Sequence, residues 1–92
     1  MKKGETYTNG QIVSQMNGDI LTYFYKDGKT RAQGKYINEC MEGEWIFYRA
    51  TGQLWQVANF LHNEKHGSWV RYDRNGKVEY DEIFDNGKLV KK

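Results

Sequence analysis

The chain has 92 residues, which is enough for one small domain. Aromatic residues make up 15% of it, a content that disordered chains do not have. The net charge is only +2, with acidic and basic residues mixed along the chain, so we expect no strong positive field of the kind that attracts nucleic acid.

The beginning of the chain and its cysteine content indicate a cytoplasmic protein. The basic start, 1–3, is followed by polar residues where a secretory signal would have an apolar run. No window contains the ~18 consecutive apolar residues that a membrane span needs. Cys40 is the single cysteine and has no partner for an internal disulfide, which fits a reducing compartment.

A sequence pattern recurs at a constant interval along the chain. The segments 43–52 and 67–76 share the pattern Gly-x-Trp-x-x-Tyr-x-x-x-Gly, and 19–28 is a degenerate copy with Leu21 and Phe24 at the Trp and Tyr positions. We therefore predict one domain over 1–92 with about three and a half repeats. The predicted copies are a partial one over about 1–18 and further ones over 19–42, 43–66 and 67–92. The glycines that keep this phase are Gly4, Gly28, Gly52 and Gly76.

Each repeat is expected to be a β-hairpin. Runs rich in aromatic and β-branched residues favour strands, and the ten glycines leave no window for a long helix. In the central repeat we predict a strand over 44–49, a tight turn at Thr51-Gly52, a return strand over 54–61, and looser connections at 38–43 and 62–67. The whole is an all-β fold: an antiparallel meander of about seven or eight strands, forming a short β-solenoid or a twisted, curled sheet. Further dipeptides typical of type I′ turns are Asn9-Gly10, Asn17-Gly18, Asp27-Gly28, Asn75-Gly76 and Asn86-Gly87.

An aromatic residue lies eight positions after the last glycine of the motif, and the loop that leads to the next copy ends in His-Gly. With these features the repeated motif resembles the MORN repeat. It is most similar to the variant form of bacterial proteins described as antitoxins or immunity proteins. The best match is 63–77, the resemblance covers about 18–90, and the copy at 19–28 is the weakest. Related proteins are described as antitoxins, interaction scaffolds or lipid-associated modules. The resemblance therefore implies a binding protein; its association with lipid kinases does not carry over, because this chain has no kinase part.

Candidate chemical groups are few. His62 and His66, with Glu64 between them, fall in a connection between repeats, where we expect exposed side chains and no metal site. Cys40 has no histidine partner in register and is expected to be an incidental thiol. The acidic residues Glu79, Asp81 and Glu82 lie among polar neighbours and form no isolated pair for acid–base catalysis. We predict no enzyme activity and no cofactor.

The aromatic residues are the main functional signal. Side chains alternate along a strand, so Trp45 and Phe47 share one face while Ile46 and Tyr48 share the other. Both faces are partly apolar, and the sequence leaves open which of them is core. At least half of the aromatic set must form the core, and the rest is expected to bind a partner. The candidate partner-binding residues are Trp45, Phe47, Trp55, Trp69 and Arg71.

The function expected from these observations is that of an inhibitor or antitoxin-type protein that blocks a toxin or enzyme sterically. The alternatives are a scaffold associated with lipid or nucleic acid, a self-assembling protein, or a homodimer formed through a sheet edge. Nucleic acid and membrane lipid are the less favoured partners, because clustered lysines occur only at the two ends of the chain.

Overall fold

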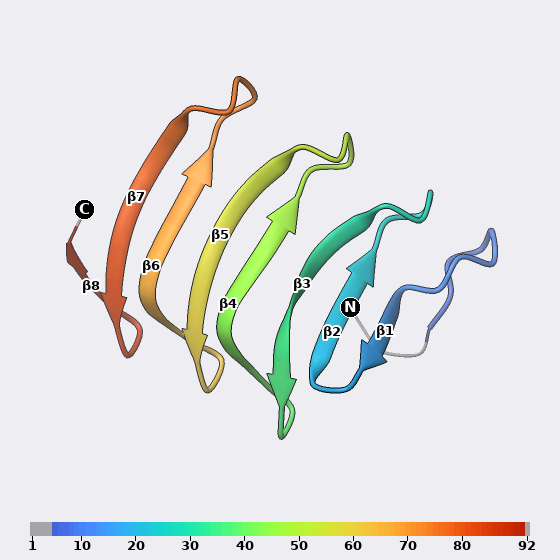
Figure 1. The fold of residues 1–92 in the computed structure, drawn as a ribbon, viewed down its shortest axis with the longest axis horizontal. Coiled ribbons are helices and arrows are strands. Elements are labelled where there is room, and N and C mark those ends of the chain that lie inside the picture. The colour runs from blue at the N-terminus through green and yellow to red at the C-terminus, as the bar shows by residue number, and fades with distance from the viewer. Residues whose placement is uncertain (1–4, 92) are drawn as a thin grey trace.

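The computed structural model describes residues 5–91, and within this range eight strands form one antiparallel sheet. Each strand pairs with the next one along the chain, so β1 and β8 are the two opposite edges of an open sheet (Figure 1). The predicted all-β meander is thereby confirmed. The strands are β1 (Ser14–Asn17), β2 (Ile20–Phe24), β3 (Thr30–Ile37), β4 (Cys40–Tyr48), β5 (Leu54–Leu61), β6 (Glu64–Tyr72), β7 (Val78–Asp85) and β8 (Lys88–Lys91).

The turns at one end of the sheet are tighter than predicted. The connections after β3 and β5, expected to be loose, are two-residue turns: Asn38 and Glu39 have φ values of 53° and 63°, and His62 and Asn63 have 51° and 71°. Two successive positive φ values define the type I′ turn, which matches the twist of an antiparallel pair. The prediction was wrong here because asparagine and histidine tolerate this left-handed region without a glycine.

The opposite end of the sheet carries longer loops, including the one predicted as a tight turn at Thr51-Gly52. The Arg49 N–H donates to the Gln53 carbonyl, and the Gly52 N–H donates back to the Arg49 carbonyl, both at 2.8 Å. The same pair of backbone bonds recurs in three other loops, at 7–11, 25–29 and 73–77. A repeat therefore consists of a hairpin with a longer loop at one end and a two-residue turn at the other.

The first repeat is shorter than the others. Its loop glycine is Gly10, which is closer in sequence to Gly28 than Gly28 is to Gly52 or Gly52 is to Gly76. The predicted equivalent, Gly4, lies outside the described residues. Because the first repeat is shorter, its loop glycine does not keep the interval of the later repeats, although its loop has the same backbone hydrogen bonds.

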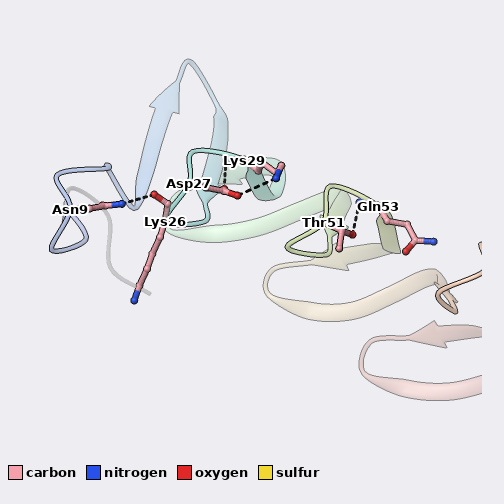
Figure 2. A network of polar contacts seen from close by, with 6 residues as sticks. All are labelled: Asn9, Lys26, Asp27, Lys29, Thr51 and Gln53. Carbon is pink, nitrogen blue, oxygen red and sulfur yellow. Dashed lines mark hydrogen bonds and ion pairs between the residues drawn. The ribbon is translucent and has the colours of Figure 1, made fainter.

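Side chains also stabilise these loops and link one loop to the next (Figure 2). The Asn9 amide donates to the Lys26 carbonyl at 2.8 Å, which ties the first loop to the second. Asp27 accepts the Lys29 N–H at 2.9 Å and contacts the Lys29 ammonium at 3.2 Å. Two hydrogen bonds from Lys29 hold the pKa of Asp27 below its ordinary value. The bond from the backbone N–H has the larger effect, and the bond from the ammonium has the smaller one.

The core lies on a single face of the sheet. Leu21, Trp45 and Trp69 occupy the same position in successive repeats on that face and are buried. The Trp45 ring packs against Phe60 at a centroid distance of 6.5 Å, and Phe60 packs against Trp69 at 5.2 Å. The indole N–H of Trp45 donates to the Lys35 carbonyl at 2.9 Å, and that of Trp69 donates to the Asn59 carbonyl at 2.7 Å. Aromatic side chains from neighbouring repeats thus form a continuous core without a second layer.

Candidate functional site

The structure places two of the predicted binding residues in the core. Trp45 is 0% exposed and Trp69 is 7% exposed. A side chain buried to this degree offers almost no area to a partner, so neither tryptophan belongs to the candidate interface. The sequence alone could not separate them from Trp55, because burial depends on which neighbouring strands cover a residue.

The other three predicted residues, Phe47, Trp55 and Arg71, are partly exposed. Trp55 and Arg71 belong to a series of stacked arginines and rings that crosses several strands, which we call the arginine–aromatic ladder. The Arg71 guanidinium lies 5.0 Å from the centroid of the Trp55 ring and 4.7 Å from that of Tyr80. The ladder consists of Tyr25, Arg31, Arg49, Trp55, Arg71 and Tyr80.

The remaining contacts add Arg49 to Trp55 and a separate Arg31–Tyr25 pair, which lines the same hollow as Trp55. The Arg49 guanidinium lies 5.9 Å from the centroid of Trp55, and that of Arg31 lies 5.5 Å from the centroid of Tyr25. Each such contact contributes roughly 0.5–1 kcal/mol at an exposed position. More important for binding, the stacking fixes the direction of both the cation and the ring.

Hydrogen bonds between repeats hold the ladder in place. The Tyr25 hydroxyl donates to the Tyr48 carbonyl at 2.7 Å, and an Arg49 guanidinium N–H donates to the Tyr72 carbonyl at 3.0 Å. The Arg71 Nε–H donates to the Gln56 side-chain oxygen at 3.0 Å. Because these side chains are already ordered, binding a partner costs less conformational entropy than it would with free side chains.

Two hollows adjoin the ladder. One of about 280 Å³ is lined by rings that include Tyr25, Trp55 and Phe47. The second, of about 370 Å³, lies toward the loops and is lined by Tyr25, Trp55, Arg49 and Arg74. Tyr25 and Trp55 line both, so they lie on the boundary between an apolar and a basic depression.

The opposite face of the sheet has a different character. A hollow of about 710 Å³ on this face is lined mostly by polar residues such as Gln15, Gln33 and Glu44. A row of cross-strand neighbours on this face runs from Ile46 through Val57 and Val70. These residues are partly buried and form a narrow aliphatic stripe, without the ordered rings and cations of the ladder.

Sequence reasoning missed two members of the ladder, Arg31 and Tyr80. The available signal was the repeat phase, since Arg31 occupies the position of Trp55 in the preceding repeat and Tyr80 occupies that of Gln56 in the following one. Lining up the repeats would have marked both positions as equivalents of Trp55 and Gln56; in the structure Arg31 lies over the Tyr25 ring and Tyr80 lies beside Arg71. Their contacts arise between neighbouring strands, however, and strand pairing fixes them only in three dimensions.

The two histidines take separate partners. His62 Nδ1 lies 2.7 Å from a Glu42 carboxylate oxygen, whereas His66 Nδ1 accepts the Asn86 N–H at 3.1 Å and lies 3.7 Å from Asp85. His62 and His66 are close in sequence, but they contact different residues and do not form a pair of metal ligands.

The fold agrees with what comparison with known families shows. Two adjacent segments of the chain, 41–62 and 65–86, match the MORN repeat variant. The first matched segment spans nearly all of β4, the loop and β5, and the second spans nearly all of β6, the loop and β7. MORN repeat proteins are generally non-catalytic binding or scaffold modules. The chain matches no curated protein and no solved structure at a significant level.

Membrane crossing by a helix has no support in the structure. Within residues 5–91 there is no helical segment with the length and apolar character that spanning a bilayer requires.

Proposed function

We propose that this protein binds a protein partner through the arginine–aromatic ladder, and that it acts as an inhibitor or antitoxin that blocks its partner sterically. The observation that carries the proposal is Trp55, a partly exposed indole with the Arg49 and Arg71 guanidinium groups at 5.9 and 5.0 Å from its centroid. Tryptophan, tyrosine and arginine dominate the energetics of protein interfaces.

The partner expected at this surface carries acidic side chains next to an apolar one. Arg49 and Arg74 border one hollow, and their charge favours carboxylates. The neighbouring ring-lined hollow accepts an apolar group. A steric mechanism requires no movement of the sheet, because hydrogen bonds between repeats hold Tyr25 and Arg49 in position before binding.

The experiment is an affinity capture from the source cells at moderate salt, with bound proteins identified by mass spectrometry. Wild-type protein should retain a stoichiometric partner, and Trp55→Ala or Arg71→Ala should lose it. Asp81→Ala is the matched control, since Asp81 is exposed and pairs with Val70 in the row on the opposite face. A partner retained equally by Trp55→Ala and by wild type would overturn the assignment of the surface.

Salt dependence distinguishes the proposed partner from the alternatives. An interface with a buried indole weakens moderately as salt rises, whereas nucleic acid or acidic lipid is released steeply. Capture of nucleic acid or of anionic vesicles, lost between low and moderate salt, would replace the protein partner with one of those classes. Inhibition is tested separately, by assaying the captured partner with and without stoichiometric protein.

A further inference from the structure

Three side chains with different metal-binding atoms meet at the end of the sheet that carries the two-residue turns. Cys40 and Glu42 belong to β4, and His62 is the first residue of the turn between β5 and β6. The thiol sulfur, a carboxylate oxygen and an imidazole nitrogen all lie within 4.8 Å of one another. We propose that these three residues bind a zinc ion.

Backbone contacts fix the position of the turn that carries His62. The next residue, Asn63, donates its N–H to the Met41 carbonyl at 3.1 Å, and its side-chain oxygen accepts the Met41 N–H at 2.7 Å. Met41 lies between Cys40 and Glu42 on β4. The turn is therefore bonded to the same stretch of backbone that carries the other two ligands, so that the three are held together before any ion arrives.

Glu42 is oriented toward His62 by two contacts. One carboxylate oxygen accepts the His62 backbone N–H at 3.0 Å, and the other lies 2.7 Å from His62 Nδ1. The Glu42 side chain is 19% exposed and that of His62 is 75% exposed, so solvent reaches the imidazole while the carboxylate is partly sheltered. An ion placed between the three groups would take the place of the direct contact between Nδ1 and the carboxylate.

The donor set selects the metal. Zinc binds cysteine sulfur, histidine nitrogen and carboxylate oxygen, and sites with three protein ligands keep a fourth position for water. Calcium and magnesium prefer oxygen ligands alone. On binding, the thiol of Cys40 releases its proton to solvent, and the imidazole of His62 carries its own proton on Nε2 while Nδ1 donates to the ion.

One neighbouring cation opposes binding. Lys35 is the cross-strand partner of Glu42, and both line a hollow of about 380 Å³ with Cys40 and His62. A positive charge on the neighbouring strand repels a divalent cation at this site. Lys35→Ala should therefore tighten zinc binding.

The next repeat provides an internal comparison. The residues that follow the three ligands by one repeat are Glu64, His66 and Asn86, so the thiol is replaced by a carboxylate and the imidazole of the turn by an amide. There His66 Nδ1 already accepts the Asn86 N–H at 3.1 Å. A histidine near the start of the equivalent strand thus serves as a control that is not part of the proposed site.

The experiment is a titration of the full, reduced chain with Co²⁺, followed by displacement with Zn²⁺ in a calorimeter. We expect one ion per chain and a thiolate-to-cobalt charge-transfer band in the near ultraviolet. Cys40→Ser should abolish this band, and His62→Gln or Glu42→Gln should weaken zinc binding by at least the roughly 10–100-fold that loss of a group hydrogen-bonded to a ligand costs. His66→Gln should bind zinc as wild type does.

Melting temperatures separate loss of the site from loss of the fold. Each variant should melt within a few degrees of wild type in the presence of a chelator, because the three side chains lie at the partly exposed end of the sheet. Zinc should raise the melting temperature of wild type and His66→Gln but not that of Cys40→Ser, since a ligand that binds only the folded state stabilises it. Saturation with Co²⁺ without a thiolate band, or equal weakening by His66→Gln and His62→Gln, would overturn the proposal.

Discussion

Gly34 lies directly across the β3–β4 pairing from Trp45, and the indole ring occupies the space that a side chain at position 34 would need. The φ angle of Gly34 is not in the left-handed region, so its backbone conformation does not require glycine. Ala58 flanks the same tryptophan on the other side, across the β4–β5 pairing. The Trp45 ring is thus buried completely in a single-layer sheet because the residue opposite it on each neighbouring strand is small.

Gly34→Ala should destabilise the protein by about 1–3 kcal/mol, the usual cost of overpacking a core, because the new methyl group would overlap the Trp45 ring. The smaller chain entropy of alanine in the unfolded state favours the variant by only about 0.4–1 kcal/mol. Urea unfolding measures the difference. The same substitution in a Trp45→Leu background should cost much less, and an equal cost in both backgrounds would show that the ring is not the cause.

Trp45→Ala should cost about 3–5 kcal/mol of unfolding free energy, since it removes a fully buried indole and leaves a cavity. Trp55→Ala is the matched comparison, because Trp55 is the same residue type on the next strand and is partly exposed. We expect it to cost less than half as much while abolishing partner binding. Chemical denaturation of both variants tests the assignment of one tryptophan to the core and the other to the interface; similar losses for both would contradict it.

Tyr25→Phe should lower stability by about 0.5–1.5 kcal/mol, because the Tyr25 hydroxyl donates to the Tyr48 carbonyl of the next repeat and that partly buried carbonyl would lose its donor. Thermal melting under identical conditions is the measurement. Tyr80→Phe is the control: no hydrogen bond of its hydroxyl is found among residues 5–91. If the two variants melt at the same temperature, the bond between repeats contributes nothing measurable.

Alkaline pH should weaken the fold through Tyr23. Burial, and secondarily the neighbouring Tyr36, raise the pKa of the Tyr23 phenol above its ordinary value of 10.0. A raised pKa in the folded state means that the fold favours the neutral phenol. This stability is fully present below pH 10.0 and is lost as the pH rises through the folded-state pKa.

The Tyr23→Phe variant isolates that effect. It keeps the ring that packs 6.4 Å from Trp45 and removes the ionisable group. Its unfolding free energy should fall less steeply than that of wild type as the pH rises past the phenol's ordinary pKa of 10.0. Parallel slopes for the two proteins would assign the alkaline loss to other tyrosines.

The positions of the strands were largely predictable, whereas their turns were not. The return strand predicted over 54–61 has the bounds of β5, because a run of aromatic and β-branched residues between turn signals is a local property. The strand predicted over 44–49 instead begins earlier, at Cys40, because the turn at Asn38 and Glu39 is tight. The length of this turn depends on Asn38 and Glu39 adopting left-handed backbone conformations, which their residue types permit but do not require.

Only the residue types of the candidate binding surface were predictable from the sequence. The alternation of side chains placed Trp45 and Phe47 on one face, but exposure separated Trp45 from Trp55, which the sequence had treated alike. Cys40 likewise had no apparent histidine partner along the sequence. The adjacent turn brings His62 beside it, because hairpins that follow one another in the chain pair side by side in the sheet.

The sequence by itself determined the repeat, the all-β class and the order of the hairpins, because periodic spacing and residue type act over short stretches of chain. Tertiary structure decided which tryptophans are core, how arginines and rings stack across strands, and which side chains of neighbouring turns meet. These outcomes depend on the register between strands, where a shift of one residue moves a side chain to the other face. Strand register is set by all the pairings together, so no single repeat encodes it.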